Sequence, residues 1–150
     1  MTTQERPGDR PVIVIDCSAL VFFLTDDGPT GHQVRKRVAE EDRLAAPHLI
    51  DYEVMSALLG LARGRRGGEP KLSERPLRKA MATFRDLPID RHETVILWER
   101  VKTLSADQSA YDAQYVALAE TLGVPLITSD ARIERSGAGR CQIEVFETPG

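Results

Sequence analysis

The sequence is poor in the residues that build metal clusters, disulfide frameworks and membrane spans. Its two cysteines, Cys17 and Cys141, are too few and too far apart for a disulfide framework or a cysteine-based metal site. The longest unbroken apolar run, 19–24, is far shorter than the ~20 residues that a membrane helix needs. Residues 1–10 are polar and contain no apolar segment of a secretory signal. We therefore expect a reduced, cytoplasmic protein with no membrane attachment.

Several catalytic motifs are missing as well. The chain has no glycine-rich phosphate loop and no Gly-x-Ser-x-Gly elbow, and its three histidines are isolated. Aromatic residues make up only 5% of the chain, so no platform for stacking nucleobases is evident. Trp98, the single tryptophan, is expected to pack within a helix. The sequence therefore gives no sign of a P-loop or serine-hydrolase site.

What remains is an ordinary globular composition with an uneven charge. At 150 residues, 41% apolar and 29% charged, the chain can form one domain with a substantial core. We expect a polar tail over 1–10 and a single domain over 11–150. The net charge is −3, yet residues 61–80 carry seven basic and two acidic side chains. Such a distribution is typical of a protein that gathers carboxylates in one place and contacts an anion in another.

The apolar pattern alternates between short buried strands and amphipathic helices. The stretches with the pattern of strands are 12–15, 43–46, 124–128 and 143–146, the last near a sheet edge. Those with helical spacing are 34–38, 52–62, 77–84, 97–104 and 111–122, where Tyr111 is placed on the apolar face. Gly64 and Gly123 are expected to end two of these helices. The alternation predicts an α/β fold with a mainly parallel sheet, in which ligands bind at the carboxyl ends of the strands.

Four acidic residues lie where such a fold would build a site. Asp16 directly follows the first strand, and Asp130 closely follows the strand that begins at residue 124. Asp112 and Glu53 each lie near the start of a predicted helix. Two carboxylates about 4 Å apart repel by roughly 4 kcal/mol at an effective dielectric of about 20, so their convergence requires protons or a cation to neutralise them. Hard divalent cations, Mg²⁺ or Mn²⁺, are the obvious partners, and they typically act on phosphoryl groups.

Each acid also has a purely structural interpretation. Ser109 and Asp112 form a capping pattern, and Asp130 could cap a turn or a helix. Glu53 could be a surface acid favoured by the helix dipole. Asp16 is harder to explain in this way, because buried sequence flanks it on both sides and an unpaired buried carboxylate is costly.

Taken together, these residues resemble the PIN-domain ribonucleases, specifically the VapC-type toxins of bacterial toxin–antitoxin pairs. The matching segments are VIDCSAL at 14–20, EVMSAL at 53–58, SAYDAQYVALA at 109–119 and PLITSD at 125–130. They occur in the family's order and span most of the chain, and 111–119 is the most specific. The resemblance implies a PIN-like three-layer sandwich with helices on both faces of the sheet.

The resemblance also implies a site and a reaction. Asp16, Glu53, Asp112 and Asp130 would form a catalytic acidic pocket that holds Mg²⁺ or Mn²⁺, with the three aspartates as metal ligands. A metal-activated water would attack an RNA phosphodiester in line. The protein would form a homodimer and be neutralised by a cognate antitoxin, which would set an arginine against the acids.

Two serines and the basic segment complete the candidate site. The resemblance implies that Ser18 supports the first acid and that Ser109 orients Asp112. Charge and placement, rather than any family motif, suggest that RNA phosphates contact the basic segment. Its candidate residues are Arg63, Arg65, Arg66 and Lys71. A solvated loop and helix would explain the same charges equally well.

Two other functions fit the same acids. The chain could be a non-catalytic PIN-like module whose pocket serves a partner, or a metal-dependent nuclease that acts on DNA. A haloacid-dehalogenase-type phosphatase is disfavoured, because Asp16-Cys17-Ser18 lacks a second aspartate two residues on.

Overall fold

The computed structural model describes residues 12–64, 67–137 and 139–147. The predicted tail over 1–10 lies outside these ranges, as do the candidate RNA-binding residues Arg65 and Arg66.

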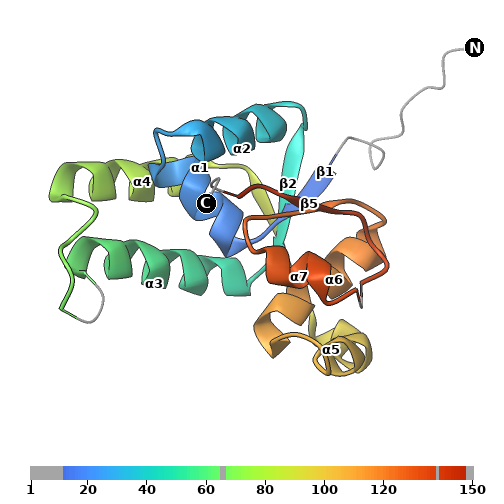
Figure 1. The fold of residues 1–150 in the computed structure, drawn as a ribbon. Helices are drawn as coiled ribbons and strands as arrows, with labels where there is room; N and C mark the ends of the chain where they lie inside the picture. The colour runs from blue at the N-terminus through green and yellow to red at the C-terminus, as the bar shows by residue number, and fades with distance from the viewer. Residues whose placement is uncertain (1–11, 65–66, 138, 148–150) are drawn as a thin grey trace, which may run out of the picture.

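The described residues form one sheet of five parallel strands (Figure 1). These are β1 (Val12–Ile15), β2 (Arg43–Pro47), β3 (Ile89–His92), β4 (Leu126–Thr128) and β5 (Ile143–Val145). Their order across the sheet is β3-β2-β1-β4-β5, and each of the four pairings is parallel. The chain winds outward from β1 in one direction and returns to build β4 and β5 in the other. The carboxyl ends of β1 and β4 therefore flank a topological switch point, where open α/β sheets bind ligands.

Helices cover both faces of this sheet. They are α1 (Cys17–Thr25), α2 (Pro29–Ala39), α3 (Leu49–Arg63), α4 (Glu74–Asp86), α5 (Trp98–Leu104), α6 (Ala110–Leu122) and α7 (Ala131–Arg135), with a 3₁₀ turn η1 (Val95–Leu97) before α5. In Figure 1, α1 to α4 lie on one side of the strands and α5 and α6 on the other. Helix α6 packs on β1, β2 and β4, whereas α1 packs on β4 and on α2, α3 and α4. The predicted three-layer arrangement is confirmed, and none of the described helices has the length and apolarity to cross a bilayer.

The core forms around β1, β4 and α6. Residues Ile13, Val14 and Ile15 are fully buried, as are Leu126 and Ile127. Because helices cover both sides of a parallel sheet, its central strands can be apolar without alternation, which is the pattern that predicts β1. The expected helix ends at Gly64 and Gly123 are also confirmed, since both glycines have the positive φ that favours them at such ends.

Three elements have no signal in the apolar pattern. Helix α1 reads CSALVFFLT and is apolar on nearly all sides, so it lacks an amphipathic period. Helix α7 has only five residues. Strand β3 reads Ile-Asp-Arg-His and lies at the sheet edge, where Asp90 pairs with Arg43 and Arg91 pairs with Asp51.

Helices α1 and α2 meet through a close contact at Gly31. The Gly31 N–H donates to Asp26 Oδ2 at 2.7 Å. A Cβ atom at this position would lie 2.1 Å from the backbone oxygen of Asp26, far inside a van der Waals contact. Because Gly31 has no side chain, α2 can pack closely against α1. The first turn of α1 borders the acidic site described below.

Replacing Gly31 by alanine tests this contact. We expect Gly31→Ala to lower the free energy of unfolding by about 1–3 kcal/mol, because α2 must shift to relieve the clash with backbone. His32→Ala changes an exposed neighbour on the same helix and should have an effect below about 0.5 kcal/mol. Urea unfolding of both variants measures the difference, and equal stabilities would contradict the assignment.

Candidate active site

A cavity of about 660 Å³ opens at the carboxyl ends of β1 and β4, and all four predicted acids line it. Asp16 lies between β1 and α1, and Asp130 lies between β4 and α7. Glu53 comes from α3 and Asp112 from the first turn of α6. The structure thus brings together four carboxylates that are up to 114 positions apart in the chain.

Asp16 is the most deeply buried of the four, with 4% of its surface exposed. As the N-cap of α1 it accepts a hydrogen bond from the backbone N–H of Ala19 at 3.0 Å. Ser18 Oγ donates to Oδ1 at 2.7 Å, and Thr128 Oγ1 donates to Oδ2. Burial nevertheless outweighs these donors and raises the pKa of Asp16 to about 6. Asp16 is therefore a carboxylate for which ionisation is costly and which a cation would stabilise.

Thr128 links the acids of β1 and β4. Its side chain is fully buried, and besides donating to Asp16 it accepts the backbone N–H of Asp130 at 2.9 Å. Ser18 Oγ likewise accepts the backbone N–H of Ser129 at 2.9 Å. The two hydroxyls hold the end of β4 against the start of α1. Sequence reasoning assigns no role to Thr128; the available signal is a hydroxyl residue at the end of a buried strand, two positions before an acid.

Asp112 and Ser109 form the capping arrangement that their spacing predicts. Ser109 is the N-cap of α6, and its Oγ accepts the backbone N–H of Asp112 at 3.0 Å. Partial burial raises the pKa of Asp112, and the negative charge of Asp130 raises it further. Ser109 thus sets the backbone position of Asp112 in the first turn of α6.

Glu53 is held by a tyrosine that the sequence pattern places in the helix core. The Tyr115 hydroxyl donates to Glu53 Oε1 at 2.5 Å, although these residues are 62 positions apart. Tyr115 is 1% exposed and also lines the cavity. Burial raises the pKa of Glu53, while the hydrogen bond from Tyr115 opposes that rise. Tyr115 is therefore a positioning residue, and its helical spacing gives no hint of this contact.

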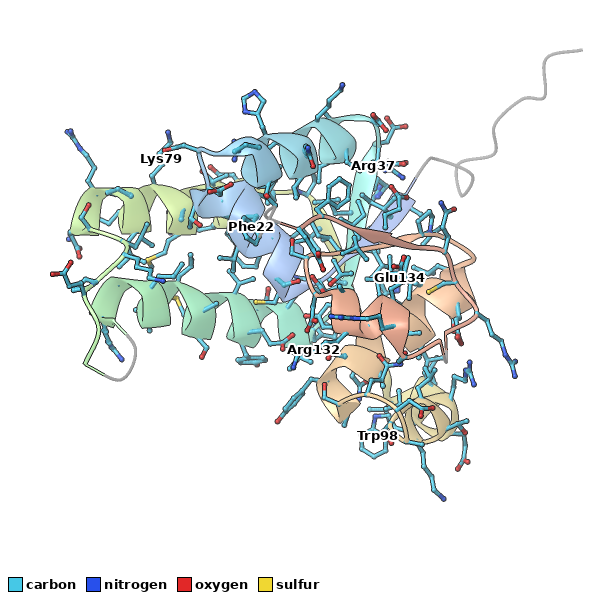
Figure 2. All side chains as sticks on the ribbon, in the orientation of Figure 1. Phe22, Arg37, Lys79, Trp98, Arg132 and Glu134 are labelled. Carbon is cyan, nitrogen blue, oxygen red and sulfur yellow. The ribbon has the colours of Figure 1, made fainter. Side chains whose placement is uncertain are left out.

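Asp130 differs from the other three acids because, within the part of the chain that the structure describes, it alone of the four has an ion-pair partner. It is the N-cap of α7 and accepts the backbone N–H of Arg132 at 3.0 Å, so the structural interpretation of this aspartate is confirmed. The Arg132 guanidinium also donates to both carboxylate oxygens, with Nε 3.0 Å from Oδ1 and Nη2 2.7 Å from Oδ2. This contact lowers the pKa of Asp130, the opposite direction to the other acids. Figure 2 shows Arg132 extending from α7 toward α3.

The four acids are the type of ligand that binds a hard divalent cation. All four acids offer carboxylate oxygens, which suit Mg²⁺ or Mn²⁺. Their present hydrogen bonds, however, point these oxygens to separate partners. Within 12–64, 67–137 and 139–147, no group of three or more His, Cys, Asp or Glu side chains is arranged to hold a metal ion. A cation at this site would therefore require some of these side chains to turn toward it.

The candidate RNA-binding residues are distributed unevenly. Lys71 lines the acidic cavity, and its backbone N–H donates to Leu61 O at 2.8 Å. Arg63 is exposed at the end of α3 and does not line that cavity. Of the basic segment as described, Lys71 is thus the residue that the structure brings to the acids.

Two aromatic residues depart from their predicted positions. Tyr111 is 62% exposed and lines a second cavity of about 430 Å³, which also contains Glu53, Asp112 and Asp130. Trp98 is 60% exposed rather than packed. Both expectations of helix packing are wrong, because a helical period places a residue on a face without saying whether a neighbour covers that face. Tyr111 gives the site an aromatic ring at its rim, where the low aromatic content suggested none.

The burial of Asp16 predicts a pH-dependent stability. The folded protein binds a proton at Asp16 more tightly than the unfolded chain does, so ionisation costs no stability well below pH 4 and its full cost above about pH 6. Asp16→Asn removes this cost. The variant's stability relative to wild type should therefore increase by about 2–3 kcal/mol between about pH 4 and pH 7.5.

Chemical denaturation in EDTA at several pH values measures this difference. Asp27→Asn, which changes an exposed aspartate, serves as the control and should show no such trend. A difference between Asp16→Asn and wild type that stays constant with pH would show that Asp16 ionises freely.

Comparison with known proteins agrees with the fold. The model of the PIN domain family matches residues 13–138. Ribonuclease VapC9 of Mycobacterium tuberculosis is 42% identical over 134 residues, which are 89% of this chain and 98% of that protein. Ribonuclease VapC12 of the same species is 33% identical over the same shares of both chains.

Solved structures share the fold at lower identity. PAE2754 from Pyrobaculum aerophilum has a TM-score of 0.61 and 24% identity, with 97% of this chain and 93% of that chain covered. VapC20 of Mycobacterium tuberculosis, described as a sarcin-ricin loop cleaving toxin, has a TM-score of 0.59 and 16% identity, with 83% and 95% covered. With its acids at the sheet's switch point and these relatives matched over nearly their whole length, the chain belongs to the PIN-domain family, among the VapC ribonucleases.

Proposed function

We propose that this protein is a metal-dependent endoribonuclease that acts as a toxin and is neutralised by a cognate antitoxin. The observation that carries the proposal is the gathering of Asp16, Glu53, Asp112 and Asp130 around one cavity in a chain of the VapC family. No pair of these acids is adjacent in the sequence, so their meeting depends on the whole fold.

Asp16, Asp112 and Asp130 would hold Mg²⁺ or Mn²⁺. When bound, such an ion supplies an activated water and stabilises charge on the phosphate oxygens. Ser18 and Thr128 fix the orientation of the Asp16 carboxylate, and Ser109 sets the position of Asp112. At these three positions the protein presents carboxylate oxygens from the N-termini of helices.

Glu53 is the candidate general base. Its carboxylate is half-buried and lines the cavity, and burial raises its pKa, which makes it a stronger base than an exposed glutamate. In the proposed hydrolysis, the water oxygen forms a bond to phosphorus and Glu53 accepts the water proton. The bond from phosphorus to the leaving oxygen breaks, and that oxygen keeps the electron pair and takes a proton from solvent. Tyr115 positions Glu53 through its hydroxyl.

Membership of the VapC family suggests an RNA substrate and an antitoxin partner, and the charges around the cavity are compatible with both. Lys71 at the edge of an acidic site would contact an RNA phosphate next to the one that is cleaved. A cognate antitoxin with a cationic side chain would be attracted to the same carboxylates. A solved structure of VapBC2 from Rickettsia felis, bound to a DNA fragment from their promoter, shares the fold with a TM-score of 0.58 and 9% identity. The homodimer and the cytoplasmic location stay predictions.

The first test is cleavage of mixed cellular RNA by purified protein with Mg²⁺ or Mn²⁺. We expect cleavage that EDTA abolishes and that Asp16→Asn or Glu53→Gln reduces by about 10²–10⁴-fold, because each change removes a carboxylate at the reacting centre. Glu74→Gln, on the exposed face of α4, should cleave like wild type.

The same assay separates the alternatives. Cleavage of single-stranded DNA but not of RNA would favour the DNA nuclease. Undiminished cleavage by Asp16→Asn would overturn the proposed mechanism. No cleavage of either nucleic acid, with no metal bound, would favour the non-catalytic module.

Replacement of Lys71 tests the RNA-binding assignment. In EDTA, which prevents cleavage, Lys71→Gln should weaken the binding of single-stranded RNA about equally for all sequences. It should also reduce the salt dependence of binding by about one phosphate contact. Lys79→Gln is the matched control, since Lys79 belongs to the same basic segment but lies on α4, well away from Arg132 in Figure 2. Fluorescence anisotropy over a salt series measures both effects, and equal salt slopes for the two variants would argue against a role for Lys71.

A further inference from the structure

Arg132 lines the cavity of the acids and pairs with one of them, Asp130. Its guanidinium donates to both oxygens of Asp130, at 3.0 Å from Nε and 2.7 Å from Nη2. Its positive charge also lowers the pKa of Asp130 and opposes the charge of Asp112. In the free protein, Asp130 is therefore already neutralised by a side chain of the same chain.

The ion pair between Arg132 and Asp130 can open at little energetic cost. The Arg132 side chain is 82% exposed, whereas Asp130 is only 22% exposed. An arginine held mainly by one exposed ion pair loses little when it leaves, because solvent screens the contact and the freed side chain regains its mobility. The backbone hydrogen bond from Arg132 N–H to Asp130 Oδ1 would keep the aspartate in place after the guanidinium departs.

The pairing conflicts with metal binding at the same carboxylate. Both Asp130 oxygens accept from the guanidinium, and no group of three acids in the described residues is arranged around a common point. A divalent ion and a guanidinium cannot share this carboxylate without strong repulsion. The arginine therefore competes with a divalent ion for Asp130, and its departure would strengthen metal binding by Asp130 with Asp16 and Asp112.

The cavity offers the arginine another partner when RNA is present. Arg132 borders both the 660 Å³ cavity of the acids and the 430 Å³ cavity beside Tyr111, so its side chain reaches the space that a phosphodiester chain would cross. A guanidinium pairs with phosphate in the same two-pronged way as with carboxylate.

From these contacts we propose that Arg132 is an exchangeable cation that couples RNA binding to metal binding. Paired with Asp130, it weakens the metal site of the free protein; paired with an RNA phosphate, it releases Asp130 to the divalent ion. This inference rests on the proposed function, since it takes Asp130 as a metal ligand and RNA as the substrate. It makes Arg132 a positioning residue that acts through Asp130.

The first arm of the test is calorimetric titration of the protein with Mn²⁺ alone, without RNA. We expect Arg132→Gln to bind Mn²⁺ about tenfold more tightly than wild type, because no guanidinium competes for Asp130. Arg135→Gln is the matched control: it removes the same charge from the same helix, and Arg135 acts on Asp130 through charge, with no hydrogen bond between them in the described structure. Its effect on Mn²⁺ binding should be twofold or less.

The outcomes separate this inference from the proposed function. Tight binding by Arg132→Gln where wild type binds weakly or not at all supports the exchange. Equal Mn²⁺ affinities of Arg132→Gln and Arg135→Gln overturn it while leaving a metal site in place. No binding by any of the three proteins overturns both the inference and the metal-dependent function. Thermal unfolding checks that the variants are folded, which the exposure of Arg132 leads us to expect.

The second arm measures the binding of single-stranded RNA in EDTA. We expect Arg132→Gln to bind about three- to tenfold more weakly than wild type, and Arg135→Gln to bind within about twofold of it. A variant with tighter Mn²⁺ binding but unchanged RNA binding would overturn the exchange, because the arginine would then have no partner to move to.

Discussion

The site depends on one buried carboxylate and the hydroxyls that hold it. Asp16 lies at the end of β1 with 4% exposure, and Thr128 at the end of β4 donates to it. Because these strands are neighbours in a parallel sheet, their carboxyl ends meet at the same edge. The hydrogen bond between them joins the two halves of the sheet at its switch point, and the other acids are arranged around that junction.

The N-termini of helices position three of the four acids. Asp16 and Asp130 are N-caps, and Asp112 lies in the first turn of its helix behind the N-cap Ser109. The carboxylates of Asp16 and Asp130 thus accept backbone N–H groups while lining the cavity, so for these two acids the capping and catalytic interpretations are compatible. The free N–H groups of a helix start also favour negative charge, which offsets part of the repulsion among the acids. Among the described residues, Asp130 is the one of these acids with an ion-pair partner, Arg132.

Much of this was predictable from the sequence, for identifiable reasons. A continuous β-branched run followed by an acid predicts both β1 and the position of Asp16, and the same logic places Asp130 after β4. The charged edge strand β3 and the uniformly apolar α1 escape prediction, because neither has the expected periodicity. The contacts of Tyr115 with Glu53 and of Thr128 with Asp16 span 62 and 112 positions, and nothing local encodes them. The ion pair of Arg132 with Asp130 escapes prediction, because a spacing of two residues does not show whether the guanidinium folds back on the acid.

The order of the strands also bears on how the protein folds. Each neighbouring pair of strands is parallel, so none can form as a simple hairpin. Strand β1 pairs with β4, which lies more than a hundred residues further along the sequence. Such long-range pairing is entropically slow and comes late relative to local helix formation. That pairing, together with the hydroxyls of Thr128 and Ser18 that join the two strand ends, brings Asp16 and Asp130 to the same cavity. A chain with its helices formed but its central strands unpaired therefore has no assembled acid cluster, and hydrolytic competence would arise together with the final cooperative closure of the sheet.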